Sequence, residues 1–227
     1  MRRSAVNVRR QLLTGLVLVL LCGSAGIRAD DWAGPVVREA FSASREWFVR
    51  VVPGKSIGDA FGFAGAAKGP YAKAEFYRRQ PDRSYRLVSE RALVNPVAPV
   101  DFFVTDRGYL ATLDNWHNMG YGKIAAFYSP NGDLVRAFEL KDLFSAAEIE
   151  AFDHSVSSIW WRKTQAVYVR EGQQSLYIAM DEKGTELILE TETGAWQFCQ
   201  WRGAEHLCRS TNVNPRWTGW AEPKLKP

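Results

Sequence analysis

The densest group of polar side chains lies between Asp114 and Gly122, in the sequence Asp-Asn-Trp-His-Asn-Met-Gly-Tyr-Gly. Asp114 is near enough along the chain to orient His117 as a general base, a pairing that hydrolytic enzymes use. Amides at Asn115 and Asn118 can donate hydrogen bonds to an oxyanion or to a sugar hydroxyl. The candidate catalytic residues here are Asp114 and His117, and the candidate binding residues are Asn115, His117, Asn118 and Tyr121.

A structural role accounts for the same residues. A buried aspartate at the end of a strand commonly caps a neighbouring turn, and Trp116 would then pack between sheets. Gly120 and Gly122 supply backbone angles that are closed to other residues. In this interpretation Asp114 accepts hydrogen bonds from nearby backbone N–H groups, and the loop contributes more to folding than to chemistry.

Ser56 is a second candidate nucleophile. The sequence Gly54-Lys-Ser-Ile-Gly58 matches the nucleophile elbow of hydrolases, in which a serine sits between a strand and a helix. Pro53 precedes this stretch, and glycine recurs at Gly62 and Gly65. Each glycine costs a helix roughly 1 kcal/mol relative to alanine. The composition therefore favours a mobile glycine-rich loop over a catalytic elbow.

Residues 1–29 have the composition of a signal peptide. Four arginines precede an apolar run from Leu12 to Leu21, and a small-residue stretch ends at Ala29. This predicts a mature domain of residues 30–227 that is periplasmic or secreted. No later run of 18 apolar residues is present, so we expect no transmembrane span.

The basic charge of the chain belongs to this N-terminal segment. The formal net charge is +4, but the segment holds five arginines and no acid. Outside it, 24 basic residues face 25 acidic ones. The mature domain therefore lacks the electrostatic footprint of a nucleic-acid-binding protein, and we expect no nucleic acid as a partner.

The cysteines predict one disulfide. Cys22 lies in the segment expected to be removed, which leaves Cys199 and Cys208. An even number of cysteines in an exported chain indicates a disulfide, and residues 202–205 have the composition of a hairpin turn between them. A metal pair with His206 is the alternative. We expect no metal, because the spacing of a zinc motif is missing and a third ligand is hard to supply.

Outside these groups, strands and turns recur at an interval of about fifty residues. This predicts an all-β fold of three repeated, four-stranded antiparallel units, over residues 45–93, 98–140 and 157–200. A short helix is expected near 142–152, where Ser145 and Glu148 are placed as a capping box. Residues 34–43 are compatible with another short helix, and residues 210–227 form a C-terminal tail.

Four strands in a meander at this interval resemble the blades of a β-propeller, most closely those of secreted bacterial propellers with irregular repeats. The resemblance covers residues 45–200. Three blades do not close a ring, because propellers need at least four. The resemblance therefore implies either a propeller-like fold with a fourth unit built from the two chain ends, or an open sandwich.

Together these features predict an exported, non-enzymatic recognition or scaffold module of the bacterial envelope or exterior. Its partner would be an envelope protein or a glycan. Neither a phosphate-binding loop nor a calcium-binding loop is present, and we expect no cofactor. The alternative is a hydrolase that acts on an envelope ester or glycan, with Asp114 and His117, or Ser56, as its working residues.

Overall fold

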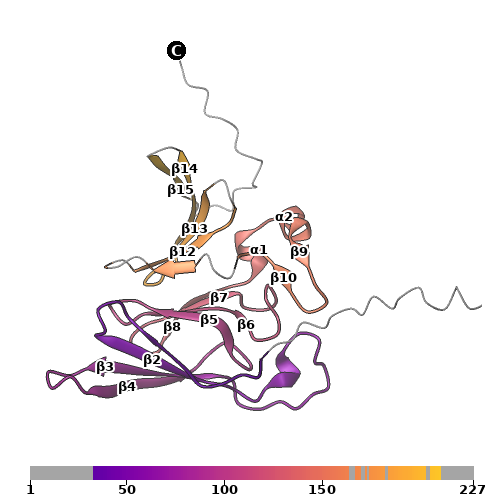
Figure 1. The fold of residues 1–227 in the computed structure, drawn as a ribbon. Coiled ribbons are helices and arrows are strands. Elements are labelled where there is room, and N and C mark those ends of the chain that lie inside the picture. The colour runs from indigo at the N-terminus through magenta and orange to yellow at the C-terminus, as the bar shows by residue number, and fades with distance from the viewer. Residues whose placement is uncertain are drawn as a thin grey trace, which may run out of the picture. The chain divides into compact units, whose positions relative to one another are not determined.

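The computed structural model describes residues 33–163, 167–169, 172, 174–181, 184–202 and 205–210. The expected signal peptide at 1–29 lies outside these residues, as does the tail beyond residue 210. The described chain consists mostly of β-strands in antiparallel sheets, with two short α-helices (Figure 1). The prediction of an all-β fold is confirmed.

The first sheet is a meander of four strands in chain order. Its strands are β1 (Arg38–Phe41), β2 (Trp47–Val52), β3 (Lys73–Arg79) and β4 (Tyr85–Ala92). The expectation of a helix over residues 34–43 is wrong, because β1 pairs with β2 along its whole length, from Arg38↔Val51 to Phe41↔Phe48. Pairing with a neighbouring strand outweighs the local helical propensity of this segment.

The second sheet repeats this arrangement. Its strands are β5 (Pro99–Val104), β6 (Leu110–Asn115), β7 (Ala125–Tyr128) and β8 (Leu134–Phe138), again antiparallel and in chain order. Both sheets fall within the expected units, except that the first one begins before residue 45.

The two central strands of the second sheet, β6 and β7, are buried on both faces. Successive side chains on a strand point to opposite faces, and on β7 they enter two different hydrophobic clusters. Ala126 and Tyr128 pack against the first sheet, whereas Ala125 and Phe127 pack against the third sheet and the helices. Burial on both faces explains why this strand is apolar throughout rather than alternating.

The third sheet has five strands. They are β11 (Val167–Val169), β12 (Ser175–Ala179), β13 (Thr185–Glu190), β14 (Trp196–Arg202) and β15 (Glu205–Ser210). It therefore starts after residue 157 and extends past residue 200. Cys199 lies directly opposite Cys208 on the β14–β15 hairpin, and the two residues form the expected disulfide.

Two short helices join the second and third sheets. They are α1 (Leu140–Leu143) and α2 (Ala146–Ala151), where the sequence predicts one helix near 142–152. The capping box of Ser145 and Glu148 is present at the start of α2. Because Phe144 has an extended backbone, the helical segment is divided at this point.

A two-stranded sheet of β9 (Asp153–His154) and β10 (Ile159–Trp160) follows α2. The sequence assigns residues 159–161 to the third repeat unit, but β10 pairs with β9 and not with a strand of the third sheet. In the described residues, the sheets form an open, sandwich-like arrangement and not a closed barrel.

Candidate functional site

The glycine-rich loop between β2 and β3 is tied to the segment that follows β4. Gly54 N donates to Val97 O at 2.7 Å, and Ala72 N donates to Asn95 O at 3.0 Å. A Cβ atom on Gly54 would lie 2.3 Å from Pro96 O, so a larger residue does not fit without a shift of backbone. Both ends of the loop are therefore fixed beside residues 95–97.

Ser56 lies at the start of the 3-10 helix η1 (Ile57–Asp59) in this loop and is fully buried. Its hydroxyl donates to Asp59 Oδ2 at 2.6 Å and accepts from Gly69 N at 3.1 Å. Lys68 and then Ser56 lower the pKa of Asp59. The hydroxyl of this candidate nucleophile thus links the two arms of the glycine-rich loop.

Asn115 organises the second loop, which connects β6 to β7. Its side-chain amide donates to the carbonyl oxygens of Tyr121 at 2.7 Å and Lys123 at 3.2 Å. Its Oδ1 accepts from Asn95 Nδ2 at 2.9 Å, and its carbonyl accepts from Asn118 N at 2.8 Å. Asn115 therefore fixes the path of the loop and joins it to the segment beside the first loop.

Asp114 is fully buried under the second loop, in the left-handed backbone region. Its Oδ1 accepts from Trp161 Nε1 at 2.7 Å and from Gly120 N at 2.9 Å. Its Oδ2 accepts from Arg162 Nε at 2.8 Å, and Arg162 Nη2 continues to Asp101 Oδ2 at 2.8 Å. Both carboxylate oxygens of Asp114 are thus engaged within the fold.

Burial is the largest influence on Asp114 and raises the pKa of its carboxyl. Three neighbours lower this pKa. The charge of Arg162 has the largest of these effects, followed by the hydrogen bond from the Trp161 indole and then by the one from the Gly120 N–H. The Gly120 N–H is a backbone donor of the kind that the structural interpretation of this loop expects. Asp114 anchors the loop to residues 161–162.

The indole buried at this corner is Trp161 and not Trp116. Trp161 is 1% exposed, whereas Trp116 is half-buried and its Nε1 donates to Ala33 O at 2.9 Å. The expectation that Trp116 packs between sheets is wrong. His117 is also half-buried, in the left-handed region, with its ring edge-on to Phe63 at 5.1 Å between centroids.

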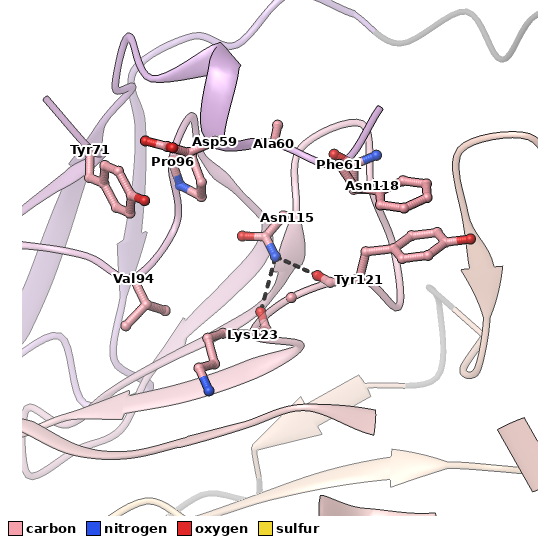
Figure 2. Close-up of a pocket in the computed structure, with 11 residues that line it drawn as sticks. Asp59, Ala60, Phe61, Tyr71, Val94, Pro96, Asn115, Asn118, Tyr121 and Lys123 are labelled. Carbon is pink, nitrogen blue, oxygen red and sulfur yellow. Dashed lines mark hydrogen bonds between the residues drawn. The ribbon is translucent and has the colours of Figure 1, made fainter. Parts of the chain in front are cut away.

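A cavity of about 390 Å³ lies between the two loops (Figure 2). Of the candidate binding residues, Asn115, Asn118 and Tyr121 line this cavity, and His117 does not. The candidate catalytic residues Ser56 and Asp114 do not line it either. The remaining lining residues are Asp59, Ala60, Phe61, Tyr71, Val94, Pro96, Gly122 and Lys123.

Aromatic side chains form two walls of the cavity. The Phe61 ring stacks on the Tyr121 ring, with centroids 3.8 Å apart and planes 5° from parallel. Tyr71 stands on the side away from this pair in Figure 2. Since Phe61 and Tyr71 belong to the first loop and Tyr121 to the second, the aromatic walls draw on both loops.

Hydrogen-bond acceptors also line the cavity. Asn118 is 1% exposed, its Nδ2 donates to Ser157 O at 3.3 Å, and its Oδ1 has no partner among the described residues. The Asp59 carboxylate lines the same space.

Two other ionisable residues of the cavity are Tyr71 and Lys123. Burial is the first cause that raises the pKa of Tyr71, and the Asp59 charge is the second. Lys123 Nζ is held by Glu139 Oε1 at 2.8 Å.

Four residues of this cavity, Asp59, Phe61, Tyr71 and Lys123, were not expected from the sequence. Two large aromatic residues within a glycine-rich loop were the available signal, because such rings need a surface to pack on. Nothing local to Arg162 indicates that it would pair with an aspartate 48 residues away.

In the described part of the chain, no group of three or more His, Cys, Asp or Glu side chains is placed to hold a metal ion. None of the described helices has the length and apolar character needed to cross a bilayer.

Fold and site together define an all-β protein of antiparallel meanders with a cavity built from two loops. No family model matches the chain, and neither a curated protein nor a solved structure is significantly similar to it.

Proposed function

We propose that the protein is an exported, non-enzymatic recognition module that binds a glycan in the cavity between residues 54–72 and 115–123. The observation that carries this proposal is the pairing of aromatic walls with hydrogen-bond acceptors in one cavity, the exposed Asp59 carboxylate and the buried Asn118 amide. Ligand pockets commonly combine apolar walls with a few placed polar groups, at volumes of about 300–1,000 Å³.

The acceptors favour a ligand that is rich in hydrogen-bond donors. A buried carbonyl oxygen without a partner costs free energy. Asn118 Oδ1 is closed to solvent in this structure, so a hydroxyl of a bound ligand would satisfy it only after a small shift of the residues that cover it. The Asp59 carboxylate adds charged acceptor atoms. A sugar ring carries several hydroxyl donors, and its apolar face can pack against Tyr71 or Tyr121.

The expected cellular location agrees with a glycan ligand. The N-terminal 29 residues resemble an export signal, and the Cys199–Cys208 disulfide fits an oxidising compartment. Glycans of the bacterial envelope or exterior would be accessible to a protein in that compartment.

The test measures binding of the purified protein to maltotriose, cellotriose and chitotriose by titration calorimetry. Phe61→Ala and Tyr71→Ala each remove part of a wall, and we expect each to weaken binding about tenfold, which corresponds to about 1.4 kcal/mol. Phe41→Ala is the matched control, because Phe41 is 44% exposed and Phe61 is 51% exposed. The control should bind as the parent does.

Absence of binding to all three sugars, or equal loss in Phe41→Ala, would count against the glycan site. Turnover of an ester or glycoside substrate that Ser56→Ala or His117→Ala abolishes would instead favour the hydrolase alternative. Melting temperatures of all variants show whether a loss of binding reflects a loss of folding.

A further inference from the structure

A second depression, separate from the glycan cavity, lies at the tip of the β3–β4 hairpin. It has a volume of about 540 Å³. Four arginines, Arg78, Arg79, Arg83 and Arg86, and one acid, Glu46, line it together with two uncharged residues. Outside the N-terminal segment, basic and acidic residues are nearly equal in number. The group of four arginines at this hairpin therefore does not reflect a basic composition of the domain as a whole.

The register of the hairpin places like charges together. Arg78 is directly opposite Arg86 on the neighbouring strand, and like charges in that position destabilise a sheet. The Arg78 guanidinium also lies over the Trp47 ring, 5.6 Å from its centroid. The hairpin therefore contains an unfavourable pair that its own strands do not relieve.

The acids near the tip neutralise little of this charge. Glu46 reaches Arg79 only at 3.8 Å. Asp82 accepts from the backbone and hydroxyl of Ser84, so it is held within the turn. Arg83 and Arg86 are exposed and form no ion pair with any residue that the structure describes. These two guanidinium groups are available to an external anion.

We propose that this hairpin tip is a binding site for a phosphate monoester group. Guanidinium forks bind phosphate oxygens through paired, charge-assisted hydrogen bonds. A doubly charged group with three acceptor oxygens suits several arginines better than a single carboxylate does. Because the depression is larger than one phosphate, the phosphate is carried on a larger molecule, a sugar or a lipid headgroup.

The test uses four probes with the purified protein: inorganic phosphate, glucose 6-phosphate, glucose, and vesicles of phosphatidylcholine with one-fifth phosphatidic acid. We expect the phosphate probes to bind and glucose not to bind at this site. The double variant Arg83→Gln/Arg86→Gln should weaken phosphate binding at least tenfold. Raising the salt concentration from 50 to 500 mM should weaken it in the parent, because exposed charges are screened.

Arg91→Gln is the matched control, because Arg91 is an exposed arginine on β4 outside the depression. It should bind phosphate as the parent does. Phe61→Ala should also leave phosphate binding unchanged, which separates this site from the glycan cavity. Whether glucose 6-phosphate or the vesicles bind more tightly identifies the carrier of the phosphate.

Stability supplies a second readout. Phosphate should raise the melting temperature of the parent but not that of the double variant. Without phosphate, Arg86→Gln should melt at or above the temperature of the parent, because the repulsion with Arg78 is removed. No binding of any phosphate probe, equal loss of binding in Arg91→Gln, or a lower melting temperature for Arg86→Gln would overturn the proposal.

Discussion

At the residue scale, Asp114 shows how a side chain that looks catalytic can serve the fold. Its carboxylate joins a backbone N–H, an indole N–H and a guanidinium. The Arg162 side chain is fully buried against it. Removal of one partner from a buried ion pair is strongly destabilising. Without the Asp114 charge, the buried Arg162 guanidinium would keep only its contact with the partly exposed Asp101.

We therefore expect Asp114→Asn to lower the free energy of unfolding by about 3–5 kcal/mol. The asparagine keeps the shape of the side chain but removes the charge that faces Arg162. Urea denaturation followed by tryptophan fluorescence measures the change. His117→Ala is the comparison, and it should have a smaller effect because His117 is only half-buried. An Asp114→Asn protein that is as stable as the parent but loses an activity would contradict this structural role.

At the element scale, Glu139 connects the start of α1 to the end of the second loop, which joins β6 to β7 and lines the cavity. Its carboxylate contacts Lys123 Nζ at 2.8 Å and Lys141 Nζ at 2.6 Å. Hydrogen bonds to Lys123 and then Lys141 lower the pKa of Glu139 to about 2. In the unfolded chain a glutamate has a pKa of about 4.3, so the unfolded chain takes up this proton first as the pH falls.

The contribution of Glu139 to stability is therefore present above about pH 4.3 and is lost as the pH falls toward 2. We expect the free energy of unfolding of Glu139→Gln to fall less than that of the parent over this pH range. Urea midpoints at pH 5, 4 and 3 measure the effect. Glu150→Gln is the control, because Glu150 on α2 forms no ion pair with the residues described. Parallel pH profiles for Glu139→Gln and the parent would refute the assignment.

The β14–β15 hairpin gives a second expectation at this scale. The Cys199–Cys208 bridge closes a short loop, since the two residues are nine positions apart. Loops of this length give a disulfide contribution of about 2–3 kcal/mol. Cys199→Ser should lower stability by an amount of that order.

Thiol labelling provides the direct measurement for this disulfide. The exported, denatured and non-reduced protein should show no free thiol from Cys199 or Cys208, and reduction should expose both. Labelling of two thiols before reduction would show that the bridge does not form in the exported protein.

At the scale of the whole molecule, the second sheet belongs to two hydrophobic clusters. Side chains on the two faces of β6 enter different clusters, with Leu110 facing the first sheet and Leu113 facing the third. Both leucines are fully buried. A shared central sheet couples the two clusters, so they should unfold together.

Leu110→Ala and Leu113→Ala should each lower the free energy of unfolding by about 2–5 kcal/mol, because each leaves a cavity in a packed core. Both variants should retain a single urea transition. Leu134→Ala is the control, since Leu134 is 51% exposed on β8. Two separated transitions in either core variant would show that the clusters are independent.

The sequence determined the features that depend on neighbouring residues. Strand and turn periodicity placed the first two sheets, because side-chain direction follows local patterns. The cysteine count with the turn composition predicted the Cys199–Cys208 hairpin, and the spacing of Ser145 and Glu148 predicted the capping box. The same local reasoning failed at residues 34–43, where the pairing of β1 with β2 outweighed helical propensity. Three of the candidate binding residues, Asn115, Asn118 and Tyr121, line the same cavity because a single short loop carries them.

Only the tertiary structure decided which distant residues meet. Asp114 and Arg162 are 48 positions apart, and Trp161 rather than the adjacent Trp116 supplies the buried indole. Phe61 meets Tyr121 because the two loops lie next to each other once the first and second sheets have packed. Such contacts depend on how sheets stack and on which charges are buried together. These are properties of long-range packing, to which the residues near each partner in the sequence contribute no signal.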